Sequence, residues 1–148
     1  MKISQAMSRT VHSILPTESM VNAARMMADH DIGALPVVED GELVGMVTDR
    51  DIAIRGVATS LNHGAPVLRV MSQDVRHCRE DDDVDDVLEI MSDEQIRRIP
   101  VCSGSGELVG MFTIGDAARE ADDKEDVSET LSHICRPHGR HSQTIPVH

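Results

Sequence analysis

Apolar residues along the chain follow two spacings, one helical and one extended. In two segments they recur three or four positions apart, which places them on one face of a helix. These residues are Met20, Ala23, Ala24 and Met27 in the first segment, and Val84, Val87, Leu88 and Met91 in the second. Thr17 and Asp82 precede the two segments as plausible N-caps. The pattern therefore predicts two amphipathic helices.

A β-hairpin is predicted after each helix. Each hairpin consists of two aliphatic runs separated by a short polar segment that is typical of a tight turn. The runs are residues 34–38 with 43–47, and residues 98–102 with 108–112. A short apolar stretch opens each unit and a shorter helix closes it. The predicted order of elements in each unit is therefore β-α-β-β-α.

The two units are copies of one repeat. A shift of 64 residues places Met7-Ser8 on Met71-Ser72 and Pro36-Val37 on Pro100-Val101. After one inserted residue in the hairpin turn the shift becomes 65, and residues 42–46 then match residues 107–111 without a difference. Self-similarity of this length indicates two structural repeats in tandem.

The predicted fold class is α/β (α+β), with two β-α-β-β-α repeats. We expect one repeat over residues 1–62, a second over 67–121 and a C-terminal tail over 122–148, with 63–66 as the linker. A unit of about 55 residues is at the lower limit of what a single core stabilises. We therefore expect the two repeats to pack sheet to sheet with pseudo-two-fold symmetry.

Composition excludes several classes of partner. The chain has 26 acidic and 14 basic residues, a formal charge of −12, which disfavours nucleic acid and anionic membranes. No apolar run is long enough for a membrane span, and the N-terminus lacks the apolar core of a signal peptide, so we expect a cytoplasmic protein. Three cysteines without CxxC spacing predict neither a disulfide framework nor a zinc ribbon.

Thr and Asp recur three residues apart where each hairpin runs into the closing helix. The pairs are Thr48 with Asp51 and Thr113 with Asp116, each preceded by Gly45 or Gly110 at the same distance. An ionised Asp can accept hydrogen bonds from both hydroxyls of a ribose, and a Thr hydroxyl can reach the sugar or a phosphate. The alternative is that each Thr is an N-cap and each Asp a charge at a helix start. Two copies in matching frames favour ligand binding.

These motifs resemble a known family. Residues 32–38 and 43–52 look like a CBS domain, and residues 96–113 with Asp116 look like a second one. The resemblance covers residues 1–121 and is greatest to small stand-alone bacterial CBS pairs. It implies two clefts between the packed sheets, each able to hold an adenosine-containing ligand such as AMP, ADP, ATP, NAD(H) or S-adenosylmethionine. It also implies no further cofactor.

The resemblance implies a role for each candidate binding residue. Thr48 with Asp51, and Thr113 with Asp116, would hold the two riboses. The adenines would face the backbone around Ala34, Leu35 and Pro36, and around Arg98, Ile99 and Pro100, while Thr10, Val11, Asp74 and Val75 complete the pockets. Arg50, Arg97 and Arg98 would lie near phosphates, because an anionic protein needs local cations to bind a nucleotide. The second repeat has Ile114-Gly115 at the positions where the first repeat has Asp49-Arg50, so we expect the two sites to differ in affinity.

Two other polar clusters have simpler interpretations. The acidic run from Glu80 to Asp86 lacks the spacing of a calcium-binding EF-hand loop and fits a solvated helix start. The tail carries His133, Cys135, His138 and His141, whose spacing matches no closed zinc site. We therefore predict no metal site, and we expect the tail to be disordered or to form an extra docking helix.

The sequence favours a regulatory module that binds an adenine nucleotide, acts on a protein target in trans and pairs as a homodimer through apolar faces of the helices that begin near Met20 and Val84. The alternative is a ligand-free dimeric interaction platform whose Cys/His tail responds to redox state or metal. No arrangement typical of a hydrolase, a P-loop enzyme or a zinc protease is present in the sequence, so we do not expect an enzyme.

Overall fold

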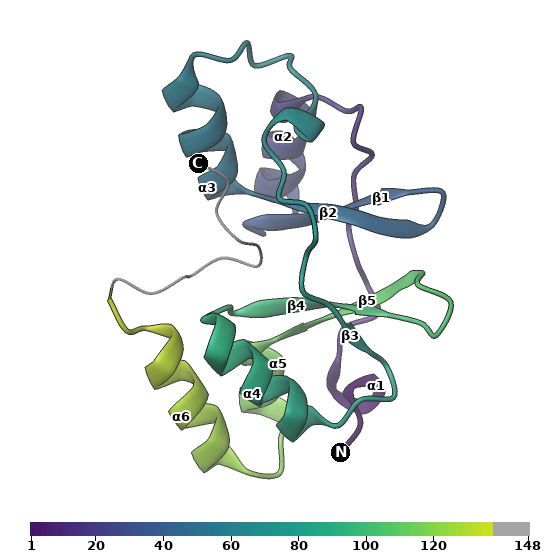
Figure 1. Ribbon diagram of the computed structural model, residues 1–148, viewed down its shortest axis with the longest axis vertical. Coiled ribbons are helices and arrows are strands. Elements are labelled where there is room, and N and C mark those ends of the chain that lie inside the picture. The colour runs from purple at the N-terminus through teal and green to yellow at the C-terminus, as the bar shows by residue number, and fades with distance from the viewer. Residues whose placement is uncertain (138–148) are drawn as a thin grey trace. The chain divides into compact units, whose positions relative to one another are not determined.

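The structure is a computed structural model of the 148-residue chain, and it describes residues 1–137. The chain forms two compact units (Figure 1). Unit 1 consists of Met1–Val11 together with the chain from Arg76 onward, and unit 2 consists of His12–Val75. Both contain a small sheet and helices, so the mixed α/β class predicted from the sequence is confirmed.

Unit 2 is built on the first predicted hairpin. Strands β1 (Ala34–Glu39) and β2 (Glu42–Thr48) pair antiparallel, with Ala34 opposite Thr48. Helix α2 (Met20–His30) precedes the hairpin, and α3 (Asp49–Asp51), a π-helical turn (Ile52–Gly56) and a 3-10 turn (Val57–Thr59) follow it. A second 3-10 turn (Val67–Arg69) returns the chain to the core. That core contains Ile14, Met20, Ala23, Met27, Leu35, Val37, Val47, Val67, Val70 and Met71.

Unit 1 is built on the second hairpin and has one more strand. Strand β3 (Cys78–Arg79) runs parallel to β4 (Arg98–Cys102), which pairs antiparallel with β5 (Leu108–Thr113). The helices are α1 (Ile3–Ala6), α4 (Val84–Glu94), α5 (Ile114–Glu120) and α6 (Lys124–Ile134). Phe112 is fully buried in the core of this unit, and the chain contains no other Phe, Trp or Tyr.

Three local predictions were wrong. The N-caps are Ser19, whose hydroxyl accepts from the Asn22 N–H, and Asp83, whose carboxylate accepts from the Asp85 N–H, rather than Thr17 and Asp82. Asp82 instead accepts from the Arg79 N–H at 2.8 Å in the preceding turn. Ala24 is exposed because the buried stripe of α2 passes through Met20, Ala23 and Met27.

The opening strand predicted for the first repeat is very short. It is reduced to a single parallel bridge between Ile14 and Val37. In the tail, α6 is the docking helix that the sequence left as one of two alternatives. It packs on α4 and buries Val127, Thr130 and Ile134. No helix within the described residues is long and apolar enough to cross a membrane.

The opening segment of each repeat packs in the unit that contains the other repeat's hairpin. In unit 1, Ser8 forms an antiparallel bridge with Met111, and in unit 2, Ser72 forms the same bridge with Met46. Each methionine uses both its N–H and its C=O for the serine, at 2.8 to 3.0 Å. Each compact unit therefore combines most of one sequence repeat with the opening segment of the other.

The exchange of opening segments explains why proline and glycine are tolerated inside the hairpin strands. Pro36 and Pro100 lie opposite Met46 and Met111, whose backbone groups already bond to the serines, so the missing proline N–H leaves no methionine carbonyl unpaired there. The preceding glycines leave room for the exchanged segments. A Cβ at Gly45 would lie 2.7 Å from the Ser72 carbonyl oxygen, and one at Gly110 would lie 2.8 Å from that of Ser8.

Candidate functional site

The Thr48–Asp51 pair forms a reciprocal capping box where β2 ends and α3 begins. The Thr48 hydroxyl accepts from the Asp51 N–H at 3.0 Å, and Asp51 Oδ2 accepts from the Thr48 N–H at 3.0 Å. The next residue, Asp49, donates its N–H to the Gly33 carbonyl at 3.0 Å. These bonds fix the Asp51 carboxylate relative to the strand, because both ends of the short segment are held by the backbone.

Thr113 and Asp116 repeat this arrangement at the start of α5. The Thr113 hydroxyl accepts from the Asp116 N–H at 3.0 Å, and Asp116 Oδ2 accepts from the Thr113 N–H at 2.9 Å. The Ile114 N–H donates to the Arg97 carbonyl at 2.9 Å, matching the bond from Asp49 to Gly33. The capping role that the sequence allowed for both threonines is thus confirmed. It engages one oxygen of each aspartate and leaves Oδ1 outside the box.

An arginine from the same helical segment approaches each of these remaining oxygens. Arg55 Nε lies 3.7 Å from Asp51 Oδ1, and an Arg119 guanidinium nitrogen contacts Asp116 Oδ1 directly. Neither arginine was among the residues predicted from the sequence. The signal that could have found them is the spacing of four and three residues, at which opposite charges meet on a helix.

Burial distinguishes these two carboxylates from ordinary surface charges. The Asp51 and Asp116 side chains are only 14% and 9% exposed. Burial raises the pKa of the Asp51 carboxyl above its ordinary value, while hydrogen bonds from Thr48 and the charge of Arg55 act in the opposite direction. A partly desolvated carboxylate strengthens its hydrogen bonds to any hydroxyl donor that reaches it.

Each unit contains one set of the predicted binding residues. Asp74 and Val75 lie in unit 2 with Thr48 and Asp51, and Thr10 and Val11 lie in unit 1 with Thr113 and Asp116. The binding residues are divided in this way because the opening segment of each repeat packs with the hairpin of the other repeat. The remaining predicted residues of unit 2 are Ala34, Leu35, Pro36 and Arg50, and those of unit 1 are Arg97, Arg98, Ile99 and Pro100.

The structure limits what the predicted adenine-facing segments can offer. Leu35 and Ile99 are fully buried in the cores, and Pro36 and Pro100 are buried in the middle of their strands. A ligand at β1 or β4 would therefore meet backbone groups at these positions rather than their side chains.

Comparison with known proteins agrees with the repeat and its motifs. The sequence model of the CBS domain matches residues 3–56 and 67–123. The chain belongs to the CBS domain family. The CBS domain-containing protein YhcV of Bacillus subtilis is 35% identical over 132 residues, which cover 89% of this chain and 94% of that protein. Hypoxic response protein 1 of Mycobacterium tuberculosis is 36% identical over 122 residues, covering 81% of this chain and 84% of that protein.

Two solved CBS structures hold adenosine compounds. CBSX2 in complex with AMP matches with a TM-score of 0.73 and 25% identity, covering 80% of this chain and 93% of that one. The CBS domain pair of protein MJ0100, solved with 5'-methylthioadenosine and S-adenosyl-L-methionine, matches with a TM-score of 0.72 and 28% identity, covering 80% of this chain and 94% of that one. These neighbours support a nucleotide-binding regulatory module as the general class of this CBS pair.

The arginines predicted near phosphates occupy different places in the two CBS repeats. Arg98 begins β4 directly opposite Thr113 in the strand register, whereas the corresponding position opposite Thr48 is Ala34. Arg50 is exposed in α3, and its N–H donates to Asp49 Oδ1 at 2.8 Å. Arg97 is exposed, and its carbonyl accepts a hydrogen bond from the Ile114 N–H at the start of α5. Unit 1 therefore has an arginine directly opposite the threonine of its Thr/Asp pair in the sheet, whereas unit 2 has an alanine there.

The clusters outside the CBS motifs have structural roles. In the acidic run, Asp83 caps α4, and Arg79 donates a hydrogen bond to Asp81 that lowers the pKa of the Asp81 carboxyl, with the charge of Arg79 acting in the same direction. In the tail, His133 shares a hydrogen bond of 2.7 Å with the Ser92 hydroxyl, and Cys135 is exposed. His138 and His141 lie outside the described residues. Up to residue 137, no three His, Cys, Asp or Glu side chains are grouped for a metal ion.

Proposed function

We propose that this CBS pair is a regulatory module that binds an adenosine-containing nucleotide at Thr48–Asp51 and at Thr113–Asp116. The observation that carries the proposal is the matched pair of carboxylates, Asp116 buried and Asp51 largely buried, each fixed by a capping box with Oδ1 outside it. Such an oxygen can accept from ribose hydroxyls, and the AMP and S-adenosylmethionine complexes of the neighbours support this ligand class.

In this proposal each unit supplies the remaining contacts from its own residues. Backbone groups of β1 and β4 face the base, and Asp74–Val75 or Thr10–Val11 complete the pocket. Arg50 and Arg98, with Arg97, provide positive charge for phosphates within a chain of net charge −12. The module carries no catalytic role here, and nucleotide occupancy is the signal that a protein target in the cytoplasm reads.

Ligand-induced stabilisation tests the proposal. At a hundred times its dissociation constant, a ligand that binds one site of the folded state adds about 2.7 kcal/mol to the free energy of unfolding. For a chain of this length we expect the melting temperature to rise by roughly 5 to 11 °C. The measurement is a thermal melt with AMP, ADP, ATP, NAD(H) and S-adenosylmethionine. Absence of a shift with all five at millimolar concentration would leave the ligand-free interaction platform as the better description.

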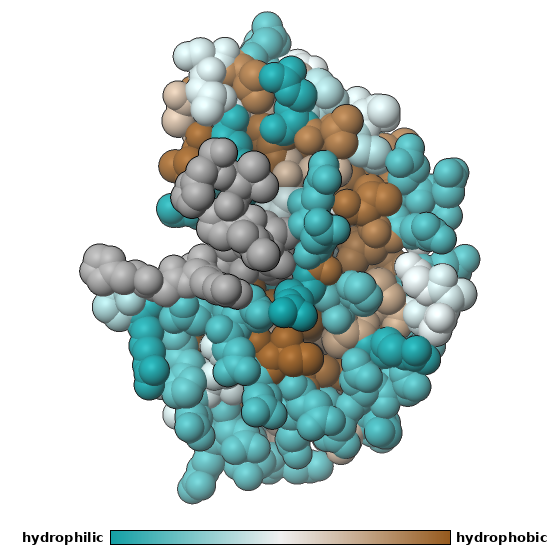
Figure 2. Space-filling model, viewed as in Figure 1, coloured by the Kyte–Doolittle hydropathy of each residue, from teal (hydrophilic) through white to brown (hydrophobic). Residues whose placement is uncertain are grey.

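We further propose that the chain forms a homodimer. Figure 2 shows hydrophobic residues on the surface of unit 2, and the large apolar side chains that unit 2 exposes are Leu15, Ile54, Val57 and Leu68. Exposed apolar side chains are typical of subunit interfaces. Light scattering at tens of micromolar is expected to give twice the 16.2 kDa mass of one chain. A monomeric mass with and without nucleotide contradicts the dimer.

A further inference from the structure

The two Thr/Asp pairs differ in how an arginine engages the aspartate. In unit 1, the Arg119 guanidinium bonds directly to Asp116 Oδ1, although the Arg119 side chain itself is 66% exposed. In unit 2, Arg55 Nε is 3.7 Å from Asp51 Oδ1, beyond hydrogen-bond distance, and its NH1 group points instead to the Met71 carbonyl at 3.4 Å. Arg119 therefore caps the outer oxygen of Asp116, whereas the backbone holds Arg55 at a distance.

The capped oxygen is the one that a ribose would need. Asp116 Oδ2 already accepts from the Thr113 N–H and from the Thr113 hydroxyl, both at 2.9 Å. A carboxylate has about four lone-pair positions, so those on Oδ1 remain, and Arg119 takes one of them. A ribose that donates two hydroxyls to Oδ1 must displace the guanidinium.

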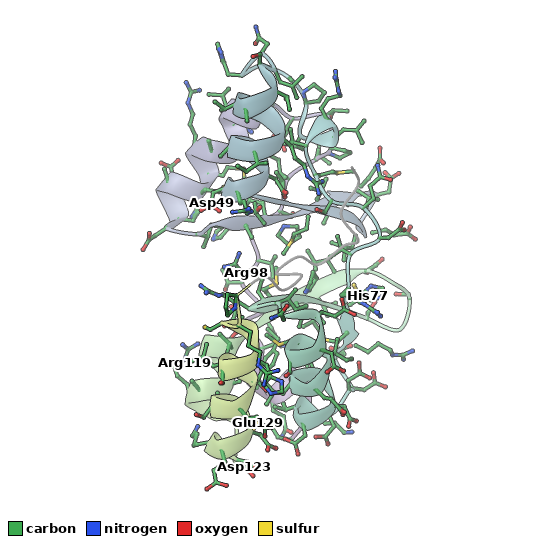
Figure 3. All side chains as sticks on the ribbon, turned by 60° about the vertical axis from the view of Figure 1, so that its left-hand side comes forward. Asp49, His77, Arg98, Arg119, Asp123 and Glu129 are labelled. Carbon is green, nitrogen blue, oxygen red and sulfur yellow. The ribbon has the colours of Figure 1, made fainter. Side chains whose placement is uncertain are left out.

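The fate of the displaced guanidinium depends on the ligand. Because most of the Arg119 side chain is exposed, it can turn away from Asp116 without disturbing the core. A neutral nucleoside offers it no new anion, so the charge-assisted bond to Asp116 is lost. A phosphate replaces that bond with an equally strong one. Arg98, directly opposite Thr113 in the sheet, adds a second cation at this site, whereas Ala34 holds the matching position in unit 2. Figure 3 labels Arg98 and Arg119, both of which belong to unit 1.

We propose that Arg119 makes the unit 1 site selective for adenosine ligands that carry phosphate, by competing with the ribose for Asp116 unless a phosphate is present to receive its guanidinium. The proposal rests on the nucleotide-binding function proposed above. The unit 2 site lacks this device, so it discriminates less between a nucleotide and its neutral nucleoside.

Calorimetry with AMP and adenosine on the full chain tests this selectivity. An Asp51→Asn background weakens the unit 2 site so that unit 1 is observed. In that background we expect AMP to bind at least about tenfold more tightly than adenosine, and Arg119→Gln to reduce this ratio by about tenfold. The reduction should come from tighter adenosine binding with little change in AMP binding, because Arg119 exchanges one anion for an equally strong one when AMP binds. Arg119→Lys, which keeps the charge, should retain more of the ratio than Arg119→Gln.

Arg69→Gln is the matched control, because Arg69 is an exposed arginine of unit 2 outside the proposed site and its loss changes the net charge equally. The proposal is overturned if the AMP to adenosine ratio survives Arg119→Gln, or if Arg69→Gln lowers it as much. It is also overturned if the Asp51→Asn chain binds neither compound while the parent binds AMP. If the parent itself binds no adenosine compound, the proposed function fails and this selectivity fails with it.

Discussion

Replacing Asp51 or Asp116 by asparagine is expected to weaken adenine nucleotide binding at the corresponding site by about ten- to a hundredfold, because each change removes a charged acceptor from the ribose. At the same nucleotide concentration the double variant should show a much smaller rise in melting temperature than the parent, because a site weakened ten- to a hundredfold adds only about 0.4 to 1.4 kcal/mol instead of about 2.7. Removing a negative charge from a chain of net charge −12 would by itself favour an anionic ligand. Weaker binding therefore reports lost hydroxyl contacts rather than a changed field.

Asparagine is the informative replacement because of how the aspartates are built in. Asp116 is more than a solvated charge at a helix start, because the residue is only 7% exposed. Its carboxylate accepts the Thr113 N–H, and alanine would leave that donor unpaired. Asparagine keeps one carbonyl oxygen as the acceptor for the cap, while its NH2 group replaces the charged outer oxygen.

Calorimetry on both single variants and the double variant measures the effect. Asp29→Asn is a suitable control, since Asp29 is exposed in α2 and the substitution removes the same charge away from the proposed sites. Equal affinity of the parent and the double variant would show that these carboxylates do not hold the ribose. A loss of similar size in Asp29→Asn would show that the effect is not specific to the two carboxylates.

Gly45→Val and Gly110→Val are each expected to lower the free energy of unfolding by about 3 kcal/mol, the upper part of the usual range for overpacking a core. A Cβ at either position lies 2.7 or 2.8 Å from a backbone carbonyl oxygen and 2.7 or 2.8 Å from a methionine sulfur. Met7 or Met71 can rotate away, but the carbonyl is fixed by the serine–methionine bridge. The substitution must therefore distort or break that bridge.

Urea unfolding measures this loss, and Gly104→Val is the matched control. Gly104 lies in the turn before β5, where an added Cβ meets only the end of the Arg79 side chain at 3.2 Å. Valine raises strand propensity and restricts the unfolded chain, both of which would stabilise β2 or β5 if space were available. A stability loss at Gly45 and Gly110 no larger than that at Gly104 would show that the exchanged segments do not pack as described.

Local spacing was sufficient to predict the hairpins and the main helices. The register from Ala34 opposite Thr48, and from Arg98 opposite Thr113, follows the alternation and turn positions visible in the sequence. The Thr/Asp pairs were found because a capping box is a local motif of fixed spacing. The N-caps were misplaced because several polar residues precede each helix, and the backbone conformation chooses among them.

Features that depend on distant parts of the chain were not predicted. Nothing in the spacing around Met7 indicates that Ser8 bonds to Met111, because that partner is determined by packing across the whole chain. The same is true of the contact from Arg55 to the Met71 carbonyl. The difference between Arg55 and Arg119 also depends on the π-helical turn at Ile52–Gly56, which has no counterpart in α5 and no clear sequence signal.

The exchange of opening segments sets an order of events during synthesis on the ribosome. Unit 2 is a continuous stretch and has all its residues once Val75 has been translated, so it can fold while the rest of the chain is still being made. Residues 1–11 emerge before their partners, because Lys2 pairs with Asp83 and Ser8 pairs with Met111. The nascent chain therefore carries an unpaired N-terminal segment throughout most of its translation, and closing unit 1 forms its most distant contacts last.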